Sequence, residues 1–145
     1  MRLRYCFLGL LLFVVGCGDN IVAVSGRVTL GDKPLPNATV VFQPVSEEPN
    51  PGPGSRGKTD ANGEYKLTLL TKDVPGAIIG KHKVSITAYE GDDGTIPSSG
   101  SNNTVFRKLL VAPEYNSKST LFFDVPAGGT TEANFKVEAP PPATK

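Results

Sequence analysis

The segment VSGRVTLGDKPLPNATVVFQP, Val24–Pro44, decides the fold of this chain. In its first half, apolar side chains or glycine alternate with polar side chains. A period of two is typical of a β-strand with one buried and one exposed face. With the preceding valine, the inward positions are Val22, Val24, Gly26, Val28 and Leu30, and the outward positions are Ser25, Arg27 and Thr29.

The second half of the segment predicts a turn and another strand. Gly31-Asp32 favours a turn, and Pro34 and Pro36 lack the N–H that a strand ladder needs. The alternation then resumes with Ala38, Val40 and Phe42, and Pro44 ends it.

Further alternating segments follow along the chain. In Lys58–Leu70, KTDANGEYKLTLL, the stretch Asp60–Gly63 suits a tight turn, because glycine adopts positive φ without strain. No amphipathic helix of useful length is present, so we expect an all-β sandwich of about seven strands. The later inward positions are Tyr65, Leu67 and Leu69, then His82, Val84, Ile86 and Ala88, then Leu121, Phe123 and Val125, and finally Ala133, Phe135 and Val137.

The chain resembles the carboxypeptidase regulatory-like domain over roughly Ile21 to Val137. The resemblance rests on Val-Ser-Gly-Arg-Val, Lys-Pro-Leu-Pro-Asn-Ala-Thr-Val-Val-Phe and Thr-Asp-Ala-Asn-Gly-Glu-Tyr, with weaker support from Gly80–Val84 and Pro113–Tyr115. It implies a single transthyretin-like β-sandwich, for which we set the bounds 21–138. Carboxypeptidases carry such a domain beside a zinc catalytic domain, and no such catalytic domain is expected here.

The first residues are typical of a lipoprotein signal peptide. Arg2 and Arg4 precede a short apolar run, which suits residues 1–16 as a signal peptide better than as a membrane span. Val14-Val15-Gly16-Cys17 resembles the bacterial lipobox, and this resemblance implies cleavage before Cys17 and a diacylglycerol on its thiol. The alternative is an ordinary secretory signal with a chance cysteine.

The resemblance to a lipobox also implies a cellular location. Several acyl chains on Cys17 would anchor the protein stably, with residues 17–20 as the linker. Gly18, rather than aspartate, follows Cys17, which favours the outer membrane over the inner membrane of the bacterial envelope. Cys6 would leave with the signal peptide, so the mature chain would have no thiol for a disulfide, metal or nucleophile.

Composition argues against nucleic acid as a partner. Without Arg2 and Arg4 the chain has 13 basic and 14 acidic side chains, whereas nucleic-acid binding calls for a basic excess. We therefore expect the membrane as one partner, through Cys17, and an envelope protein or a glycan as another.

Two polar segments are the candidate binding loops. Val45–Gly57 and Glu90–Asn103 lack a hydrophobic period and are expected to be exposed loops, and residues 139–145 to be a proline-rich tail. Side chains in or beside these loops that could contact a ligand are Glu47, Glu48, Arg56, Tyr89, Asp92, Asp93 and Tyr115.

Neither a metal site nor a catalytic site is predicted. Asp60, Asn62 and Glu64 resemble the start of a calcium loop, but a hairpin turn accounts for the same residues. His82, the only histidine, alternates with lysines in a strand, so a structural or surface role is favoured over catalysis. Hydroxyisourate hydrolases share the transthyretin fold, but they use several histidines and a C-terminal Tyr-Arg-Gly-Ser that this chain lacks.

The sequence therefore predicts a non-enzymatic, membrane-anchored envelope lipoprotein that serves as a binding or structural module without a cofactor. Its contacts would come from the two loops or from strand addition at a sheet edge. The alternatives are a carbohydrate- or peptide-binding accessory protein in nutrient capture and, third, a small-molecule hydrolase.

Overall fold

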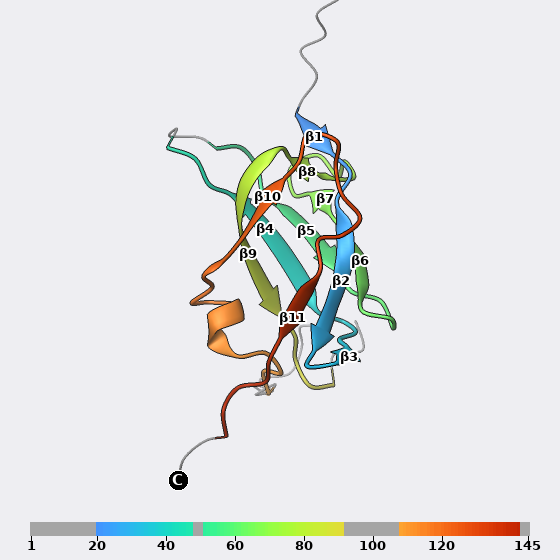
Figure 1. The fold of residues 1–145 in the computed structure, drawn as a ribbon, viewed down its shortest axis with the longest axis vertical. Helices are drawn as coiled ribbons and strands as arrows, with labels where there is room; N and C mark the ends of the chain where they lie inside the picture. The colour runs from blue at the N-terminus through green and yellow to red at the C-terminus, as the bar shows by residue number, and fades with distance from the viewer. Residues whose placement is uncertain (1–19, 48–50, 92–107, 143–145) are drawn as a thin grey trace, which may run out of the picture.

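The structure is a computed structural model that describes residues 20–47, 51–91 and 108–142. These residues form an all-β sandwich (Figure 1), as the sequence predicts. Of the eleven described strands, seven have at least three residues. They are β2 (Ser25–Leu30), β4 (Thr39–Pro44), β5 (Ser55–Lys58), β6 (Glu64–Lys66), β9 (Gly80–Thr87), β10 (Leu121–Val125) and β11 (Phe135–Val137).

Four two-residue strands and a 3-10 helix complete the described elements. These are β1 (Ile21–Val22), β3 (Lys33–Pro34), β7 (Thr68–Leu69), β8 (Ala77–Ile78) and η1 (Pro113–Tyr115).

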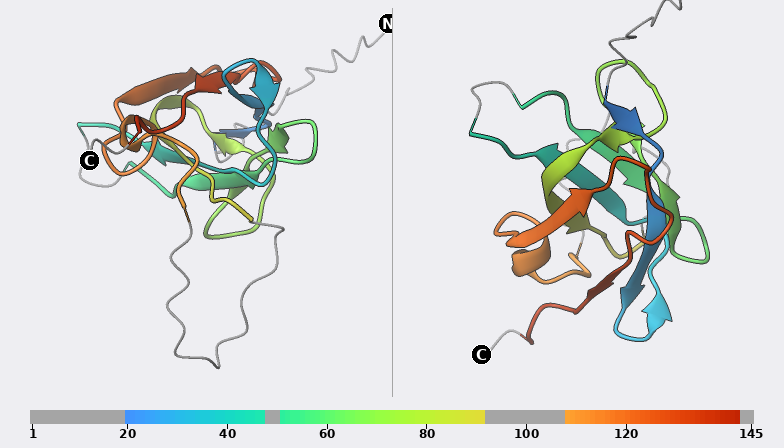
Figure 2. Two further views of the ribbon diagram at one scale, coloured as in Figure 1. Left: turned by 90° about the horizontal axis from the view of Figure 1, so that it is seen from below. Right: turned by 45° about the horizontal axis from the view of Figure 1, so that its top comes forward.

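The larger sheet is antiparallel throughout, in the order β10-β9-β4-β5-β7. In the second sheet β2 is central, with β11 parallel to it on one side and β3 and β6 antiparallel to it. The short strands β1 and β8 pair at one end of the molecule. Figure 2 shows that the larger sheet curls, so that its β10 edge lies beside β11.

The core lies between the two sheets, and the alternation seen in the sequence determines which side chains enter it. Phe42 is its centre: its ring lies 5.7 Å from that of His82, 5.6 Å from that of Phe123 and 6.1 Å from that of Phe135. The inward positions expected in Val24–Val28, Ala38–Phe42 and His82–Ala88 are buried, whereas Val22 in β1 and Leu30 at the end of β2 are partly buried.

Strand β5 corrects one expectation. Val45–Gly57 was expected to be an exposed loop, yet its last three residues belong to β5, which pairs with β4 and β7. The inward side chains of β5 are Ser55 and Gly57, so the strand has the period of two without a hydrophobic signal. At the inward position 57 only glycine fits, because a Cβ there would lie 2.5 Å from the carbonyl oxygen of Lys66.

Strand β3 refines another expectation. The chain does turn at Gly31-Asp32, but Lys33 and Pro34 then pair with Leu30 and Thr29. Proline is tolerated here because β3 is at the edge of its sheet, where its missing N–H leaves no ladder bond unmade.

Candidate functional site

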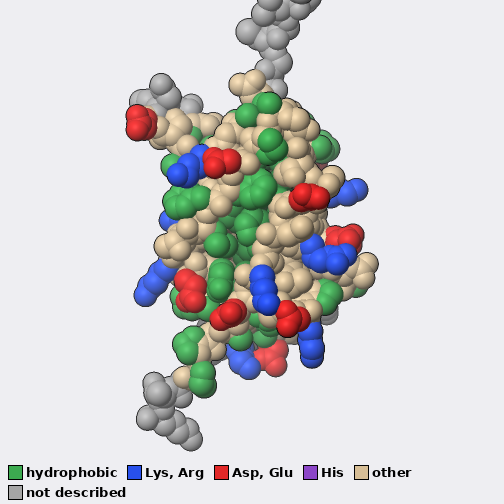
Figure 3. Space-filling view, in the orientation of Figure 1, with side chains coloured by type: hydrophobic (Ala, Val, Ile, Leu, Met, Phe, Trp, Pro, Cys, Tyr) green, Lys and Arg blue, Asp and Glu red, His purple; other side chains and the backbone are tan. Residues whose placement is uncertain are grey.

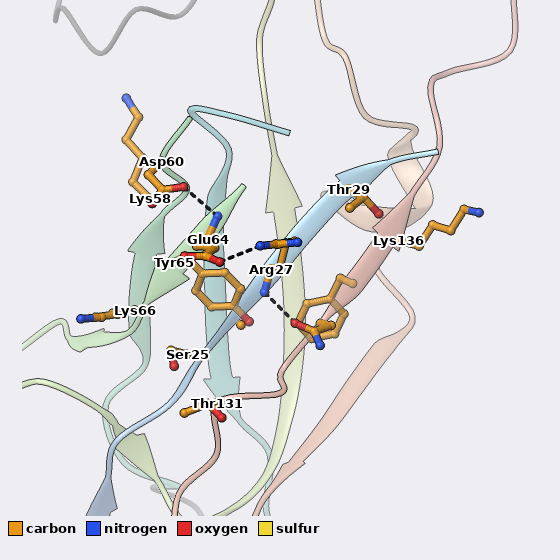
Figure 4. A pocket seen from close by; sticks show the side chains of 13 residues that line it. Ser25, Arg27, Thr29, Lys58, Asp60, Glu64, Tyr65, Lys66, Thr131 and Lys136 are labelled. Atoms are coloured by element: carbon orange, nitrogen blue, oxygen red, sulfur yellow. Dashed lines mark hydrogen bonds and ion pairs between the residues drawn. The ribbon is translucent and has the colours of Figure 1, made fainter. Parts of the chain in front are cut away.

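An open groove of about 1020 Å³ lies on the outer face of the second sheet (Figure 4). We call it the β2 groove, because the outward side chains of β2 form its floor. Neighbouring positions of β6 and β11 and the turn before β6 form its walls. Its lining residues are Ser25, Gly26, Arg27, Thr29, Lys58, Asp60, Glu64, Tyr65, Lys66, Thr131, Asn134, Phe135 and Lys136.

An ion pair bridges the groove from β2 to β6. The guanidinium of Arg27 donates to Glu64 Oε1 at 2.7 Å, and the backbone N–H of Arg27 donates to Asn134 Oδ1 at 2.8 Å (Figure 4). Both charged side chains are about half exposed, so solvent screens the pair and its contribution to stability is small. Arg27 thus links three segments that are distant in sequence.

The turn at the groove's edge accounts for Asp60, Asn62 and Glu64. Asp60 Oδ1 accepts from the backbone N–H of Asn62 at 2.8 Å and from that of Glu64 at 2.9 Å, which makes it an Asx-turn acceptor. Gly63 has φ +75°, as the tight turn requires. Within residues 20–47, 51–91 and 108–142, no three His, Cys, Asp or Glu side chains are grouped to hold a metal ion.

A second surface ion pair lies at the far end of β11. Lys136 Nζ donates to Asp32 Oδ1 at 2.8 Å. This hydrogen bond and the charge of Lys136 lower the pKa of Asp32 below its ordinary value and raise the pKa of Lys136 above its own. Asp32 and Lys136 are largely solvent-exposed, so the pair marks charge complementarity rather than a stabilising contact.

The chemistry of the β2 groove suits contact with a polar partner. Four basic and two acidic side chains line it, together with hydroxyl and amide groups, and its lining includes neither histidine nor cysteine. The excess of basic groups favours a partner that presents carboxylates or many hydroxyl groups.

Arg56, a predicted contact residue, points outward from β5 rather than from a loop. It lines a smaller cavity of about 480 Å³ on the outer face of the larger sheet. The other lining residues are Thr39, Gly57, Lys58, Thr68, Leu69, Leu70 and Asp73.

Tyr89 and Tyr115 lie at one end of the molecule but differ in exposure. Tyr89 is 40% exposed and bridges to Leu109, beside an ion pair of 3.4 Å between Glu90 and Lys108. Tyr115 lies in η1, is partly buried against the core, and has its pKa raised chiefly by loss of solvent. Only Tyr89 therefore offers an open aromatic face.

The bases of the two predicted loops lie at opposite ends of the larger sheet. In the pairing of β4 with β9, Pro44 lies opposite His82 while Thr39 lies opposite Thr87. The 45–54 segment therefore leaves from one end, and the segment after Tyr89 leaves from the other. The described bases of the two loops are therefore at different ends of this sheet. Glu47 is exposed at the first base, whereas Cys17, Glu48, Asp92 and Asp93 lie outside the described residues.

His82 is a core residue, 1% exposed. Its Nδ1 lies 3.0 Å from the Gly80 carbonyl oxygen, so the neutral ring carries its proton there and donates. Its Nε2 has no hydrogen-bond partner among the described residues. Burial lowers the pKa of His82, opposed by the Gly80 bond and the charge of Asp124.

Tyr65 and Thr59 are buried polar residues whose hydrogen bonds, which the sequence did not predict, connect separate segments of the fold. The hydroxyl of Tyr65 donates to the Ala133 carbonyl oxygen at 2.7 Å, and burial raises the pKa of the phenol. Thr59 Oγ1 accepts from the Ala38 N–H at 2.8 Å and donates to the Leu35 carbonyl oxygen at 2.6 Å. The only signal in the sequence for these hydrogen bonds is a hydroxyl group at an inward strand position, Tyr65, and beside a turn, Thr59.

Comparison of the chain with protein-family models, curated proteins and solved structures found no match. The described part of the chain contains no helix of the length and hydrophobicity that a membrane crossing requires.

Proposed function

We propose that this protein is a non-enzymatic, lipid-anchored module of a bacterial envelope that binds a polar envelope partner through the β2 groove. The observation that carries the proposal is a large, solvent-facing groove of polar and charged side chains on a sandwich whose first described strand begins four residues after Cys17.

The position of the sandwich in the chain supports the anchor. The first described strand, β1, starts at Ile21, so all described strands follow Cys17. Cleavage before Cys17 would therefore leave every one of these strands intact. A lipid on that residue would hold the sandwich at the membrane while its opposite end, with the chain's C-terminal residues, points away (Figure 1).

The positions of the catalytic candidates favour binding over hydrolysis. His82 points into the core from β9, whereas Arg56 points outward from β5 in the same sheet. A histidine on the inner face and an arginine on the outer face cannot act on one substrate. Four charged residues of the β2 groove, Arg27, Asp60, Glu64 and Lys136, make ion pairs or turn hydrogen bonds that a docking surface would tolerate.

The anchor is tested with two cysteine variants of the full chain carrying a C-terminal tag. Cys17→Ala should abolish incorporation of an alkyne-tagged fatty acid and release the protein from the membrane fraction, because the acyl chains are its anchor. Cys6→Ala is the matched control and should leave both unchanged. Membrane retention of Cys17→Ala, or an unmodified Cys17 in the purified protein by mass spectrometry, would refute the anchor.

The groove is tested by in-cell crosslinking followed by mass spectrometry. Lys66→Glu reverses a charge on the β6 wall of the groove and should reduce recovery of the groove's partner several-fold, because it removes charge complementarity. Lys118→Glu, an equal charge change on an exposed residue outside the groove, should not. Equal crosslinking by both variants and the wild type would place the contact surface elsewhere.

A carbohydrate-binding accessory role is the second candidate, and the exposed ring of Tyr89 favours it. That ring lies at the end of the sandwich away from β1, where an aromatic face could stack on a sugar. Binding of soluble glycans that Tyr89→Ala abolishes and Lys66→Glu leaves intact would favour this role over the groove.

A further inference from the structure

We propose that one end of the sandwich rests in the headgroup region of the membrane that holds the Cys17 lipid. This basal end comprises β1, β8, the 69–75 turn and residues 52–53. The inference rests on the proposed lipid anchor and adds a second, non-covalent contact to it.

The length of chain before β1 brings the basal end to the membrane. Three peptide units separate Cys17 from Asn20, and each spans at most about 3.8 Å between Cα atoms, so the tether reaches no more than about 11 Å. Asn20 is already fixed to the basal end, because its carbonyl oxygen accepts from the Ile79 N–H at 2.7 Å. A lipid inserted at Cys17 therefore holds this end within a headgroup layer's thickness of the bilayer.

The basal end carries an apolar groove at the point where the chain leaves toward Cys17. Its volume is about 530 Å³. Apolar side chains from β1, β7 and β8 form much of its wall, with the 69–75 turn at its rim. The lining residues are Asn20, Ile21, Gly52, Pro53, Leu69, Thr71, Lys72 and Ile78.

Exposed hydrophobic side chains gather around the same end. Of the five large hydrophobic residues that are most exposed in the described part of the chain, Leu70 is 52%, Val45 43% and Val74 38% exposed, and all three lie here. The Leu69 N–H donates to the Val74 carbonyl oxygen, which closes the turn, and the Val45 N–H donates to the Lys81 carbonyl oxygen beside β8. Figure 3 shows hydrophobic side chains at the end where the N-terminal chain emerges.

The charges at the tip of the turn indicate that apolar burial, rather than attraction to anionic lipid, would hold the basal end at the membrane. Lys72 and Asp73 are adjacent, exposed and of opposite sign, so the tip has no net attraction for an anionic surface. Contact would come from burying Leu70 and Val74 at the boundary between headgroups and acyl chains, as in other interfacial surfaces. The contact should therefore depend weakly on the fraction of anionic lipid.

Single-cysteine labelling of the lipidated full chain tests the inference. Cys6 and Cys17 are the only cysteines, so once Cys6 is cleaved off and Cys17 is a thioether, an introduced cysteine is the only free thiol. Leu70→Cys places an environment-sensitive fluorophore on the basal end, and Thr71→Cys is a second position there. Tyr89→Cys is the control, because Tyr89 is 40% exposed at the end of the sandwich away from β1.

In vesicles of zwitterionic lipid that contain spin-labelled lipid, quenching at residue 70 or 71 should be roughly three times that at residue 89, because interfacial apolar surfaces lie ~5–10 Å deep. Equal quenching at the three positions would overturn the inference. Blue-shifted emission at residue 70 that escapes the lipid quencher and grows with protein density would mean that a second copy covers the basal end, and would also overturn it. Labelling of the parent chain without added cysteine would instead reveal a free Cys17, and the lipid anchor itself would fail.

Discussion

At the scale of the residue, polar side chains inside the core do most to distinguish this molecule. Tyr65 and Thr59 satisfy their hydroxyl groups with backbone partners, whereas His82 leaves one ring nitrogen without a partner among the described residues. A satisfied buried group is costly to remove, and a half-satisfied one makes stability depend on its charge state.

His82 should make the sandwich less stable in mild acid. Its pKa is lowered in the folded protein, while in the unfolded chain it is about 6.5, so below that pH the unfolded state binds a proton that the folded state resists. The free energy of unfolding should therefore fall as pH drops from 7 to 5.5. Asp124 is the nearby carboxylate that opposes this effect.

His82→Leu replaces the titrating imidazole ring with an apolar side chain of similar size. Urea unfolding of this variant should show a flatter pH dependence between 7 and 5.5, because His82 is the only histidine. An unchanged pH dependence in the variant would show that another group is responsible.

Tyr65→Phe should destabilise the protein by about 1–2 kcal/mol, because the Ala133 carbonyl oxygen loses its buried donor. The control is Tyr89→Phe, which removes a hydroxyl from a side chain that is 40% exposed and should change stability little. Urea unfolding of both variants measures the difference. Equal urea midpoints for the two variants would show that the hydrogen bond between Tyr65 and Ala133 does not contribute measurably to stability.

At the scale of the element, glycines allow two strands to pass unusually close to other segments. At Gly26, the 129–134 segment passes directly over β2: the Ala133 N–H donates to the Ser25 carbonyl oxygen at 3.1 Å. A Cβ on Gly26 would lie 2.0 Å from the Ala133 carbonyl oxygen. Because that neighbour is backbone, a rotamer change cannot relieve the clash.

Gly26→Ala should therefore cost about 3 kcal/mol or more of unfolding free energy, or prevent folding, since the 129–134 segment must move. Gly128→Ala is the matched control in the same connection, where a Cβ meets no heavy atom within 4 Å, and its cost should stay within about 0.5 kcal/mol. Thermal unfolding compares the two. A Gly26→Ala protein as stable as Gly128→Ala would contradict the close crossing.

At the scale of the whole molecule, the sandwich presents different surfaces at its two ends and on its side. The basal end carries Leu70 and Val74, the opposite end carries Tyr89, and the β2 groove lies between them. An anchor at Cys17 would leave the groove and the Tyr89 end accessible to partners in the envelope.

A chain that starts at Gly18 should fold as the full sandwich does, because every described strand begins after that residue. Its far-UV circular dichroism should be that of a β-protein. Its unfolding should be a single cooperative transition, as expected for one small domain. A truncated chain that unfolds gradually, without a transition, would show that earlier residues contribute to the core.

The alternation of apolar and polar residues was enough to predict the fold class and most of the inward-facing residues. The alternation in Val22–Leu30, Ala38–Phe42 and His82–Ala88 is a local pattern. Because side chains in a strand alternate between two faces, the apolar set identifies the face that is buried. The turn at Asp60–Gly63 was equally predictable, because its residue types suit the backbone angles. Strand β5 was missed because its inward positions are Ser55 and Gly57, which give no hydrophobic signal. The close approach of the Lys66 backbone, which explains the glycine at position 57, is visible only in the structure.

The tertiary structure alone decided the candidate site. Arg27, Glu64, Asn134 and Lys136 come from three separate parts of the chain, and only the pairing of β2 with both β6 and β11 brings them to one face. Strand register likewise separates the bases of the two predicted loops, and the pairing of β5 with β7 brings the turn that carries Leu70 and Val74 beside β1. Such long-range pairings depend on the packing of the whole core, which no local pattern in the sequence records.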